Sequence, residues 1–245
     1  MSIIEKTNPL NLQYKVCVVT NASTPLGVVI CKTLLKANAL VLGIDKNARD
    51  HSLNAALGTH FQFEQRDVND PETPREIITA SQKKFDSLGG KFAALVNLIG
   101  EDEADLGGLQ NLTKVLGDVM REAGQGSVIT IPGNVGSSDG SRSEALTDFA
   151  KDVTRLFEGT AIRTNMIVSD SAMSGDQGSA KPYEEAKFYM KALIKTENPA
   201  KDAPDAKQTP SRFYEVGNLV LFLAGDMSEE ISGQAVSLDG SHQPL

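Results

Sequence analysis

A short polar turn near the N-terminus has the composition of a phosphate-binding site. It runs from Thr20 to Gly27, between an apolar run of strand length and a segment of helical spacing. Such a turn directs backbone N–H groups and a helix N-terminus toward a ligand, which suits a pyrophosphate. Asn21 can adopt the positive φ that most non-glycine residues avoid, whereas Pro25 fits a first helical turn but removes one N–H donor. The turn is equally compatible with a strand–helix connection that binds nothing. The residues expected at a bound cofactor are Thr20, Asn21, Ser23, Leu26 and Gly27.

A carboxylate stands at the end of the next apolar run. Asp45 closes the strand pattern at residues 40–45. A carboxylate at this place accepts hydrogen bonds from both ribose hydroxyls of an adenosine and repels a 2′-phosphate. NAD(H) is therefore favoured over NADP(H), although Lys46 and Arg49 lie close enough to weaken the preference. The alternative is a strand end whose carboxylate is only solvated.

The hydrophobic pattern predicts the strands and helices that would position the turn and Asp45. Apolar runs of strand length alternate with segments of helical period, which is typical of a parallel sheet covered by helices on both faces. Strands are expected near residues 16–20, 40–45, 61–63, 92–99, 127–131, 163–168 and 234–238. Helices are expected at residues 26–36, 73–85, 109–123, 143–157 and 214–224. The expected fold is α/β, a doubly wound Rossmann-type parallel seven-stranded sheet in a single domain of residues 1–245.

One stretch interrupts the alternation. Residues 170–211 are polar and rich in Gly, Ser, Pro, Lys and Asp. A long insertion between two core strands is typical of a lid or substrate loop. The chain has no internal repeat and no recognisable domain boundary.

Composition excludes several classes of function. The formal net charge of −8 argues against nucleic acid or an anionic membrane as a partner. No apolar run is long enough to span a bilayer, and the first residues lack a signal-peptide core, so a cytoplasmic location is expected. Cys17 and Cys31 fall in apolar patterns and are expected to be buried free thiols. No cluster of Cys and His has metal-ligand spacing, so no metal site is expected.

Seven short segments of the chain carry a recognisable series of motifs. They are residues 20–27, 67–68, 97–100, 126–131, 162–165, 214–224 and 231–240. In this order they resemble the motifs of the short-chain dehydrogenase/reductase family, over nearly the whole chain. The resemblance implies a nicotinamide dinucleotide, with Asp67 and Val68 at its adenine and with Asn97 and Gly100 lining the cofactor site.

The resemblance fails where the family performs its chemistry. The family uses a serine to orient the substrate oxygen, and a tyrosine, acidified by a lysine four residues later, to transfer the proton. Here the serine position holds Gly133, and a gapless alignment places Asp139 and Ser143 at the tyrosine and lysine positions. The stretch between Gly100 and Gly126 is also shorter than in the family, which removes its catalytic asparagine. Loss of a positioned general acid costs about 10²–10⁴ in rate.

Other polar residues are candidates for a replacement chemistry. Tyr183 and Lys187 match Y-x-x-x-K, but they follow the strand that should come after them, and such an i, i+4 pair is common on helix surfaces. Asp170 stands beside the expected nicotinamide position, and Asp139 and Arg142 fall on the shortened loop. Each charge is also compatible with a solvated loop position.

Three hypotheses of function remain. The first is a dinucleotide-binding enzyme with a non-standard active site, acting on a small organic and potentially bulky substrate by atypical reduction or by redox-neutral isomerisation or cyclisation. The second is a catalytically inactive scaffold or regulatory subunit, which pairs with an active homologue. The third is an ordinary NAD-dependent dehydrogenase that uses Tyr183 and Lys187. The resemblance implies a homodimer through the helices that begin near residues 109 and 143.

Overall fold

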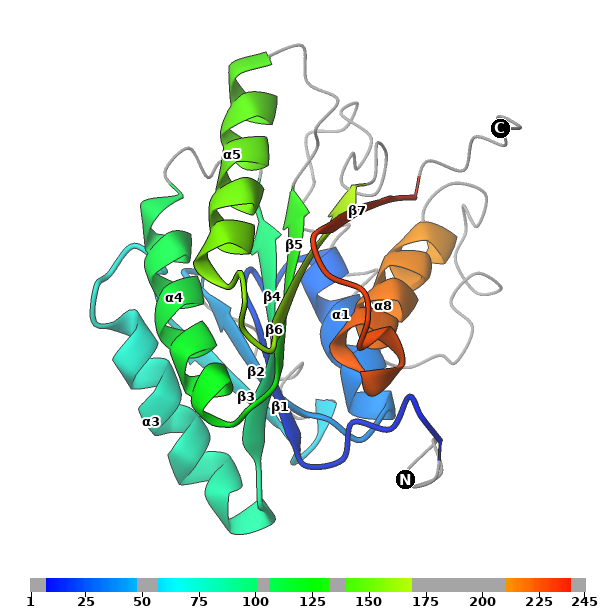
Figure 1. Cartoon of the computed structure of the whole chain (residues 1–245). Helices are drawn as coiled ribbons and strands as arrows, with labels where there is room; N and C mark the ends of the chain where they lie inside the picture. Colours follow the sequence, from blue (N-terminus) through cyan, green and yellow to red (C-terminus); the bar gives the residue numbers. More distant parts are fainter. Residues whose placement is uncertain (1–7, 48–56, 101–105, 133–139, 169–209, 239–245) are drawn as a thin grey trace, which may run out of the picture.

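All strands that the structure describes form one parallel sheet (Figure 1). The computed structural model describes residues 8–47, 57–100, 106–132, 140–168 and 210–238. The strands are β1 (Lys15–Val19), β2 (Leu40–Asp45), β3 (Phe61–Gln65), β4 (Lys91–Ile99), β5 (Gly126–Pro132), β6 (Ile162–Val168) and β7 (Gln234–Ser237). Their order is β3-β2-β1-β4-β5-β6-β7. The predicted doubly wound, seven-stranded α/β fold is therefore confirmed.

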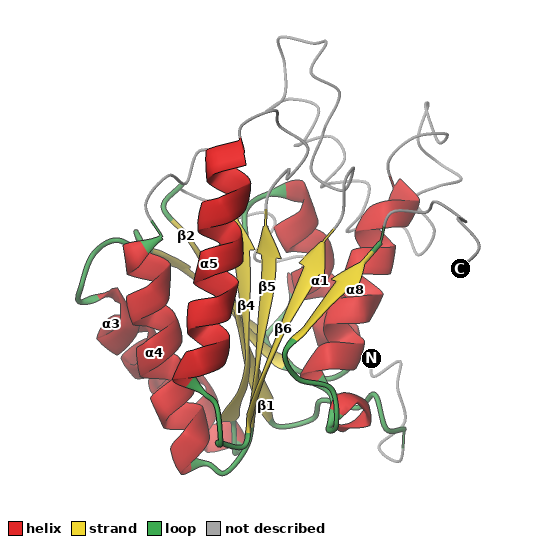
Figure 2. Ribbon diagram, turned by 45° about the horizontal axis from the view of Figure 1, so that its top comes forward, coloured by secondary structure: helices red, strands yellow, loops and turns green. Residues whose placement is uncertain are grey.

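Helices cover both faces of this sheet (Figure 2). Helices α1 (Pro25–Lys36) and α8 (Pro210–Ala224) lie side by side on one face. The other face carries α3 (Thr73–Phe85), α4 (Gly107–Glu122) and α5 (Gly140–Leu156). Two short 3₁₀ turns, Asp86–Leu88 and Asp226–Ser228, follow α3 and α8.

The central strands are buried on both sides, which explains their continuous apolar runs. In β4, Val96 and Leu98 belong to the core under α1 and α8, whereas Leu95 and Ile99 belong to the core under α3, α4 and α5. Successive side chains of a strand point to opposite faces, so a strand with a helix layer on each side needs apolar residues at every position.

Both cysteines are fully buried free thiols, as predicted. Cys17 lies on β1 and Cys31 on α1, in the same apolar core. Burial raises the pKa of the Cys17 thiol to about 12, because the core disfavours the thiolate. The two residues therefore act as small apolar side chains.

Arg163 on β6 anchors the end of α8. Its guanidinium donates hydrogen bonds to the carbonyl oxygens of Leu223 (2.8 Å), Gly225 (3.2 Å) and Ser228 (3.1 Å). The last carbonyls of a helix have no partner within the helix, and this guanidinium supplies one from the sheet. Arg163 therefore ties the end of α8 to β6, and the hydroxyl of Ser127 on β5 donates to the same Leu223 carbonyl at 2.8 Å.

Element ends differ from the predicted ones by a few residues. The helix at residues 73–85 and the strand at residues 40–45 are confirmed at both ends. Helix α5 begins at Gly140, so Arg142 lies in a helix and its predicted place on a loop is wrong. Helix α8 begins at Pro210, inside the predicted insertion. Both first turns are largely polar, so the apolar period that marks a helix begins only after them.

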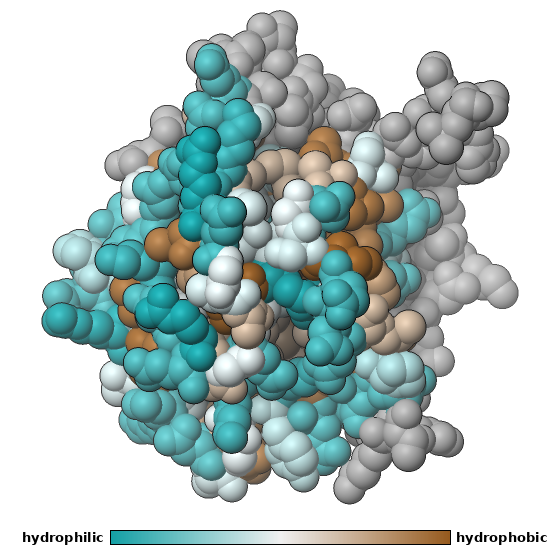
Figure 3. Space-filling view, in the orientation of Figure 1, coloured by the Kyte–Doolittle hydropathy of each residue, from teal (hydrophilic) through white to brown (hydrophobic). Residues whose placement is uncertain are grey.

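The outer surfaces of α3, α4 and α5 are mostly hydrophilic (Figure 3). Over the part of the chain that the structure describes, no helix is both long and apolar enough to cross a membrane. Within the same residues, no group of three or more His, Cys, Asp and Glu side chains is placed to hold a metal ion.

Candidate dinucleotide site

The strand order reverses at β1 and β4, which predicts a ligand crevice at the carboxyl ends of these two strands. From β1 the sheet continues through β2 and β3 to one side and through β4 to β7 to the other. The connections on the two sides of such a reversal run apart and leave a crevice, where doubly wound proteins bind their ligands. The turn that follows β1 and the end of β4 border this crevice.

The β1–α1 turn is hydrogen-bonded to the end of β4. Asn21 has φ +48°, which confirms the positive φ that the sequence indicates. Its side-chain amide donates to the Leu98 carbonyl at 2.7 Å. The Thr20 hydroxyl donates to the same carbonyl at 3.0 Å and accepts from the Leu98 amide at 2.9 Å. These bonds hold the two walls of the crevice at a defined separation.

The N-terminus of α1 offers a backbone amide to an anion. The Thr24 side chain caps the helix by accepting from the Gly27 amide at 3.1 Å. Pro25 lies in the first turn and has no N–H. Leu26 lies in the first turn of α1, where an amide has no acceptor within the helix, so its N–H is a donor for an anion. A helix N-terminus favours an anion also through its dipole.

Gly27 allows the turn to lie against α1. A Cβ at this position would stand 2.4 Å from the Asn21 carbonyl oxygen and 2.8 Å from the Ala22 Cα. A Cβ on Gly43 of β2 would stand 2.7 Å from the Ala22 Cβ. The turn is thus packed tightly between α1 and β2, which matches the close helix–strand packing of dinucleotide-binding turns.

Asp45 ends β2 as predicted, but its carboxylate is bonded within the protein. The residue is 2% exposed. Its Oδ2 accepts from the Ser23 amide at 3.1 Å and from the Ser23 hydroxyl. Its Oδ1 accepts from the Asn47 amide at 2.9 Å. Contact between this carboxylate and a ribose stays a prediction.

The predicted adenine-side residues form a tight turn after β3. Asp67 is exposed, and its carboxylate accepts from the Asn69 amide at 2.9 Å. Val68 is half-buried and packs against the core under α3, α4 and α5. A Cβ on Gly108 of α4 would stand 2.4 Å from the Val68 carbonyl oxygen, so α4 begins directly against this turn. Contact between Val68 and an adenine stays a prediction.

Asn97 and Gly100 lie on the other wall. Asn97 is fully buried on β4, and its amide donates to the Thr113 hydroxyl of α4 at 2.9 Å. Its carbonyl oxygen has no hydrogen-bond partner in the described part of the chain. Gly100 is half-buried, directly after β4. Asn97 thus joins the sheet to α4, and contact between Gly100 and a cofactor stays a prediction.

The candidate catalytic residues are not brought together in the part of the chain that the structure describes. Tyr183, Lys187, Asp170 and Asp139 lie outside the described residues, and Arg142 falls in the first turn of α5. Helix α5 contains no tyrosine. Its one lysine, Lys151, is exposed and pairs with Asp148 at 3.2 Å.

The sequence pattern did not indicate two features of the structure. One is the contact between Ser23 and Asp45, for which the only signal is a serine two residues after a positive-φ position. The other is Tyr214 on the first turns of α8, whose buried hydroxyl has no partner among the described residues. Burial raises the pKa of this hydroxyl above its ordinary value.

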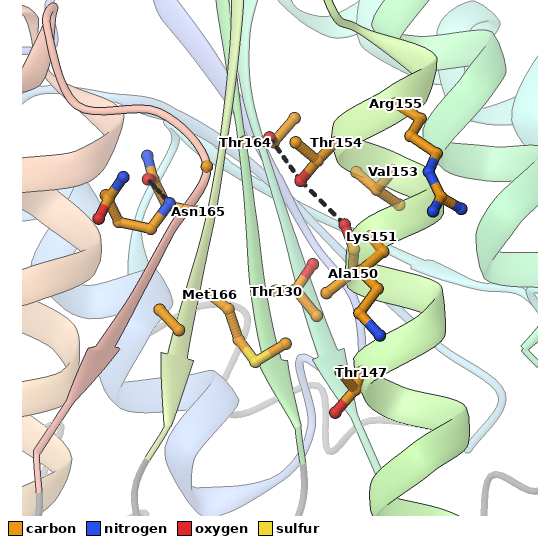
Figure 4. A pocket seen from close by; sticks show the side chains of 13 residues that line it. Thr130, Thr147, Ala150, Lys151, Val153, Thr154, Arg155, Thr164, Asn165 and Met166 are labelled. Atoms are coloured by element: carbon orange, nitrogen blue, oxygen red, sulfur yellow. Dashed lines mark hydrogen bonds between the residues drawn. The ribbon is translucent and has the colours of Figure 1, made fainter.

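A separate cavity of about 370 Å³ lies beneath α5, against β5, β6 and β7 (Figure 4). Thr130, Thr147, Thr154 and Thr164 contribute hydroxyls to its wall, and Met166 contributes a thioether. The hydroxyls of Thr154 and Thr164 are 3.1 Å apart. This cavity is on the opposite face of the sheet from α1, so it is distinct from the turn that follows β1.

Comparison with known proteins agrees with this geometry. No family model matches the chain. It is 25% identical to the short chain dehydrogenase andC of Emericella variicolor, over 93% of this chain and 96% of that protein. It is also 25% identical to the 3-beta-hydroxysteroid dehydrogenase of Comamonas testosteroni, over 94% and 96%. A solved short chain dehydrogenase from Leptospira borgpetersenii with bound NAD+ superposes with a TM-score of 0.66 at 18% identity, over 98% of this chain and 97% of that one. The chain is thus similar to dehydrogenases at 25% identity or less, and the structural likeness shows a shared fold.

Proposed function

We propose that the chain is a short-chain dehydrogenase/reductase-type enzyme that binds NAD(H) across the carboxyl edge of its sheet and works with a non-standard active site. The observation that carries the proposal is the turn at the reversal of strand order. Asn21 has a positive φ there, and Gly27 permits close packing on α1. Doubly wound proteins hold dinucleotides at this place. A relative whose description includes bound NAD+ supports the choice of cofactor.

Each part of the dinucleotide has candidate residues in the crevice. The amide of Leu26 and the N-terminus of α1 would hold the pyrophosphate, with one donor fewer because of Pro25. Val68 would cover the adenine, and Asp45 would accept from the ribose once Ser23 releases it. Gly100 would lie beside the nicotinamide end. When bound, NADH supplies a hydride at this end of the site.

The absence of a tyrosine from α5 supports a reaction that needs no proton from the protein. The gapless alignment places Asp139 and Ser143 where the family has its tyrosine and lysine, and α5, which follows Asp139 directly, contains no tyrosine. An iminium substrate is already protonated. Hydride addition to its carbon gives a neutral amine, and NADH becomes NAD+ with no further proton. A bulky substrate is consistent with the steroid named for one relative.

A redox-neutral isomerisation or cyclisation is the alternative within the same proposal. In that case the protein would shape and orient the substrate, and the dinucleotide would serve as part of the pocket wall. Such a reaction would leave the absorbance of added NADH unchanged while the substrate is converted. Product analysis by chromatography separates the two cases.

A catalytically inactive protein is the second candidate, and one observation favours it. The side chains of Thr20, Asn21, Ser23 and Thr24 are all hydrogen-bonded within the protein. A turn saturated in this way has fewer donors to offer a ligand. In a chain that pairs with an active homologue, the fold would serve to present a surface that binds the partner, and it would not need to bind a dinucleotide.

A calorimetric titration with NAD, NADH, NADP and NADPH tests the proposal. Binding of NADH in the micromolar range is the expected result. Turnover is then assayed with NADH and a set of cyclic iminium ions, with matched ketones as controls. Activity on ketones that disappears in Tyr183→Phe would instead support an ordinary dehydrogenase. If none of the four dinucleotides binds, both the atypical reductase and the ordinary dehydrogenase are refuted.

A further inference from the structure

We propose that Ser23 closes the adenosine subsite of the ligand-free protein, so that a dinucleotide binds only when Asp45 exchanges Ser23 for the ribose. Ser23 would then set both the affinity for the cofactor and the choice between NADH and NADPH. This inference rests on the proposed function, because it concerns the cofactor of that same site.

Three donors converge on the Asp45 carboxylate. The amide and the hydroxyl of Ser23 both donate to Oδ2, and the amide of Asn47 donates to Oδ1. A carboxylate offers about four lone-pair positions, of which these bonds use three. With 2% of Asp45 exposed, the remaining position does not face a ligand. Two ribose hydroxyls therefore cannot both bond to this carboxylate while Ser23 stays in place.

The turn holds Ser23 in this position through contacts of its own. The Ala22 amide donates to the Ile44 carbonyl of β2 at 3.1 Å. The side chain of Ala22 fills the space above Gly43, where a Cβ would stand only 2.7 Å from it. The Thr24 hydroxyl donates to the Asn21 carbonyl at 2.8 Å. The contact between Ser23 and Asp45 is thus part of a docked turn rather than the chance meeting of two exposed side chains.

The hydrogen bond from the Ser23 hydroxyl to Asp45 can break while the turn stays packed against β2. The Ser23 hydroxyl is carried by one rotatable bond, and rotation about that bond moves the oxygen while Ala22 stays on β2. The hydroxyl of the ribose can then replace the hydroxyl of Ser23 on Oδ2. The exchange replaces one charge-assisted hydrogen bond by another. The Ser23–Asp45 bond must break before the ribose can bind, so its free energy lowers the affinity for the cofactor.

The same contact weakens discrimination against a 2′-phosphate. The three hydrogen-bond donors direct the positive ends of their dipoles at the Asp45 carboxylate, which offsets part of its repulsion of a neighbouring phosphate. Lys46, the next residue, is exposed and carries the opposite charge. We therefore expect the wild-type protein to distinguish NADH from NADPH only weakly.

Titration of the variant Ser23→Ala with NADH and with NADPH tests the inference. Ser23→Ala should bind NADH about tenfold more tightly than wild type does. The gain corresponds to the removal of one hydrogen bond to a charged group that competes with the ribose. NADPH should gain less, so the ratio of the two dissociation constants should rise. Thr160→Ala is the matched control. It loses two internal hydroxyl bonds away from the dinucleotide site, one donated to the Phe157 carbonyl at 2.7 Å and one accepted from the Ile162 amide at 3.2 Å, and should leave both constants unchanged.

A second measurement needs no cofactor. Urea unfolding of wild type, Ser23→Ala, Asp45→Ala and the double variant gives the coupling between the two side chains. Coupling worth about tenfold in the unfolding equilibrium constant is expected for a charge-assisted bond. Strictly additive effects would show that the contact does not exist and would overturn the inference.

The binding outcomes separate this inference from the proposed function. If wild type binds NADH and Ser23→Ala binds equally or more weakly, Ser23 does not compete with the ribose, and only this inference is overturned. If neither protein binds any dinucleotide, releasing Asp45 does not open a site, and the proposed function is overturned with it.

Discussion

Gly27 brings α1 into close backbone contact with the β1–α1 turn, and its replacement by alanine tests the packing on which the candidate site depends. The added Cβ would stand 2.4 Å from the Asn21 carbonyl oxygen and 2.8 Å from the Ala22 Cα. Both are backbone atoms, so no side-chain rotation relieves the overlap. Either α1 must move away from the turn, or the turn must leave β2.

The loss of stability expected for Gly27→Ala is at the upper end of the range for overpacked cores. Extra methyl groups in a packed core cost about 1–3 kcal/mol. Here the displaced helix carries buried residues such as Ile30, and the cap bond from the Gly27 amide to Thr24 is strained as well. We therefore expect Gly27→Ala to lower the free energy of unfolding by about 3 kcal/mol, the top of that range. Urea denaturation followed by far-ultraviolet circular dichroism measures it, and titration shows whether NADH affinity falls too.

Gly225→Ala is the matched control. Gly225 has φ −89°, and the nearest atom to a Cβ there is the Leu221 carbonyl oxygen at 3.4 Å, an ordinary contact. Its free energy of unfolding should stay within about 0.5 kcal/mol of wild type, or rise slightly through the lower entropy of the unfolded chain. Equal stability of Gly27→Ala and Gly225→Ala would refute the close packing of the turn on α1.

Two other predictions concern the frame of the site. Arg163→Met should lower the free energy of unfolding by about 2–3 kcal/mol, because the carbonyls at the end of α8 lose charge-assisted partners. Arg155→Met, which removes only an exposed ion pair, should change it by less than about 0.5 kcal/mol, and equal effects in urea denaturation would contradict the assigned role of Arg163. The Cys17 thiol, whose pKa is raised from 9.0 to about 12, contributes stability that is fully present below pH 9 and is lost as the pH rises toward 12. Across that window wild type should lose about 1.4 kcal/mol per pH unit more than Cys17→Ala, and equal slopes would contradict the burial of the thiol.

The fold was predictable because its signals are local. A strand between two helix layers is apolar at every position, and a surface helix is apolar on one stripe, so both can be recognised without knowing the neighbours. The strand at residues 40–45 and the helix at residues 73–85 illustrate this, since both ends of each are confirmed. The start of α5 was predicted too late because its first turn carries no apolar period.

The candidate site was predictable only in part. The positive φ of Asn21 followed from the residue type, and the place of Asp45 at a strand end followed from the pattern. The roles expected for Asp170, Asp139, Tyr183 and Lys187 fall outside the described residues and stay predictions. The direction in which Asp45 points was not accessible, because a residue type does not specify its hydrogen-bond partner.

The sequence by itself determined the alternation of strands and helices, the burial of Cys17 and Cys31, and the turn where a dinucleotide would lie. Each of these depends on the polarity or backbone preference of residues close together in the chain. The tertiary structure alone decided which side chains meet: Ser23 with Asp45 across 22 positions, and Arg163 with the Leu223 carbonyl across 60. Hydrogen bonds require both groups to arrive at about 3 Å with suitable angles, and only the assembled sheet and helices bring such distant groups together.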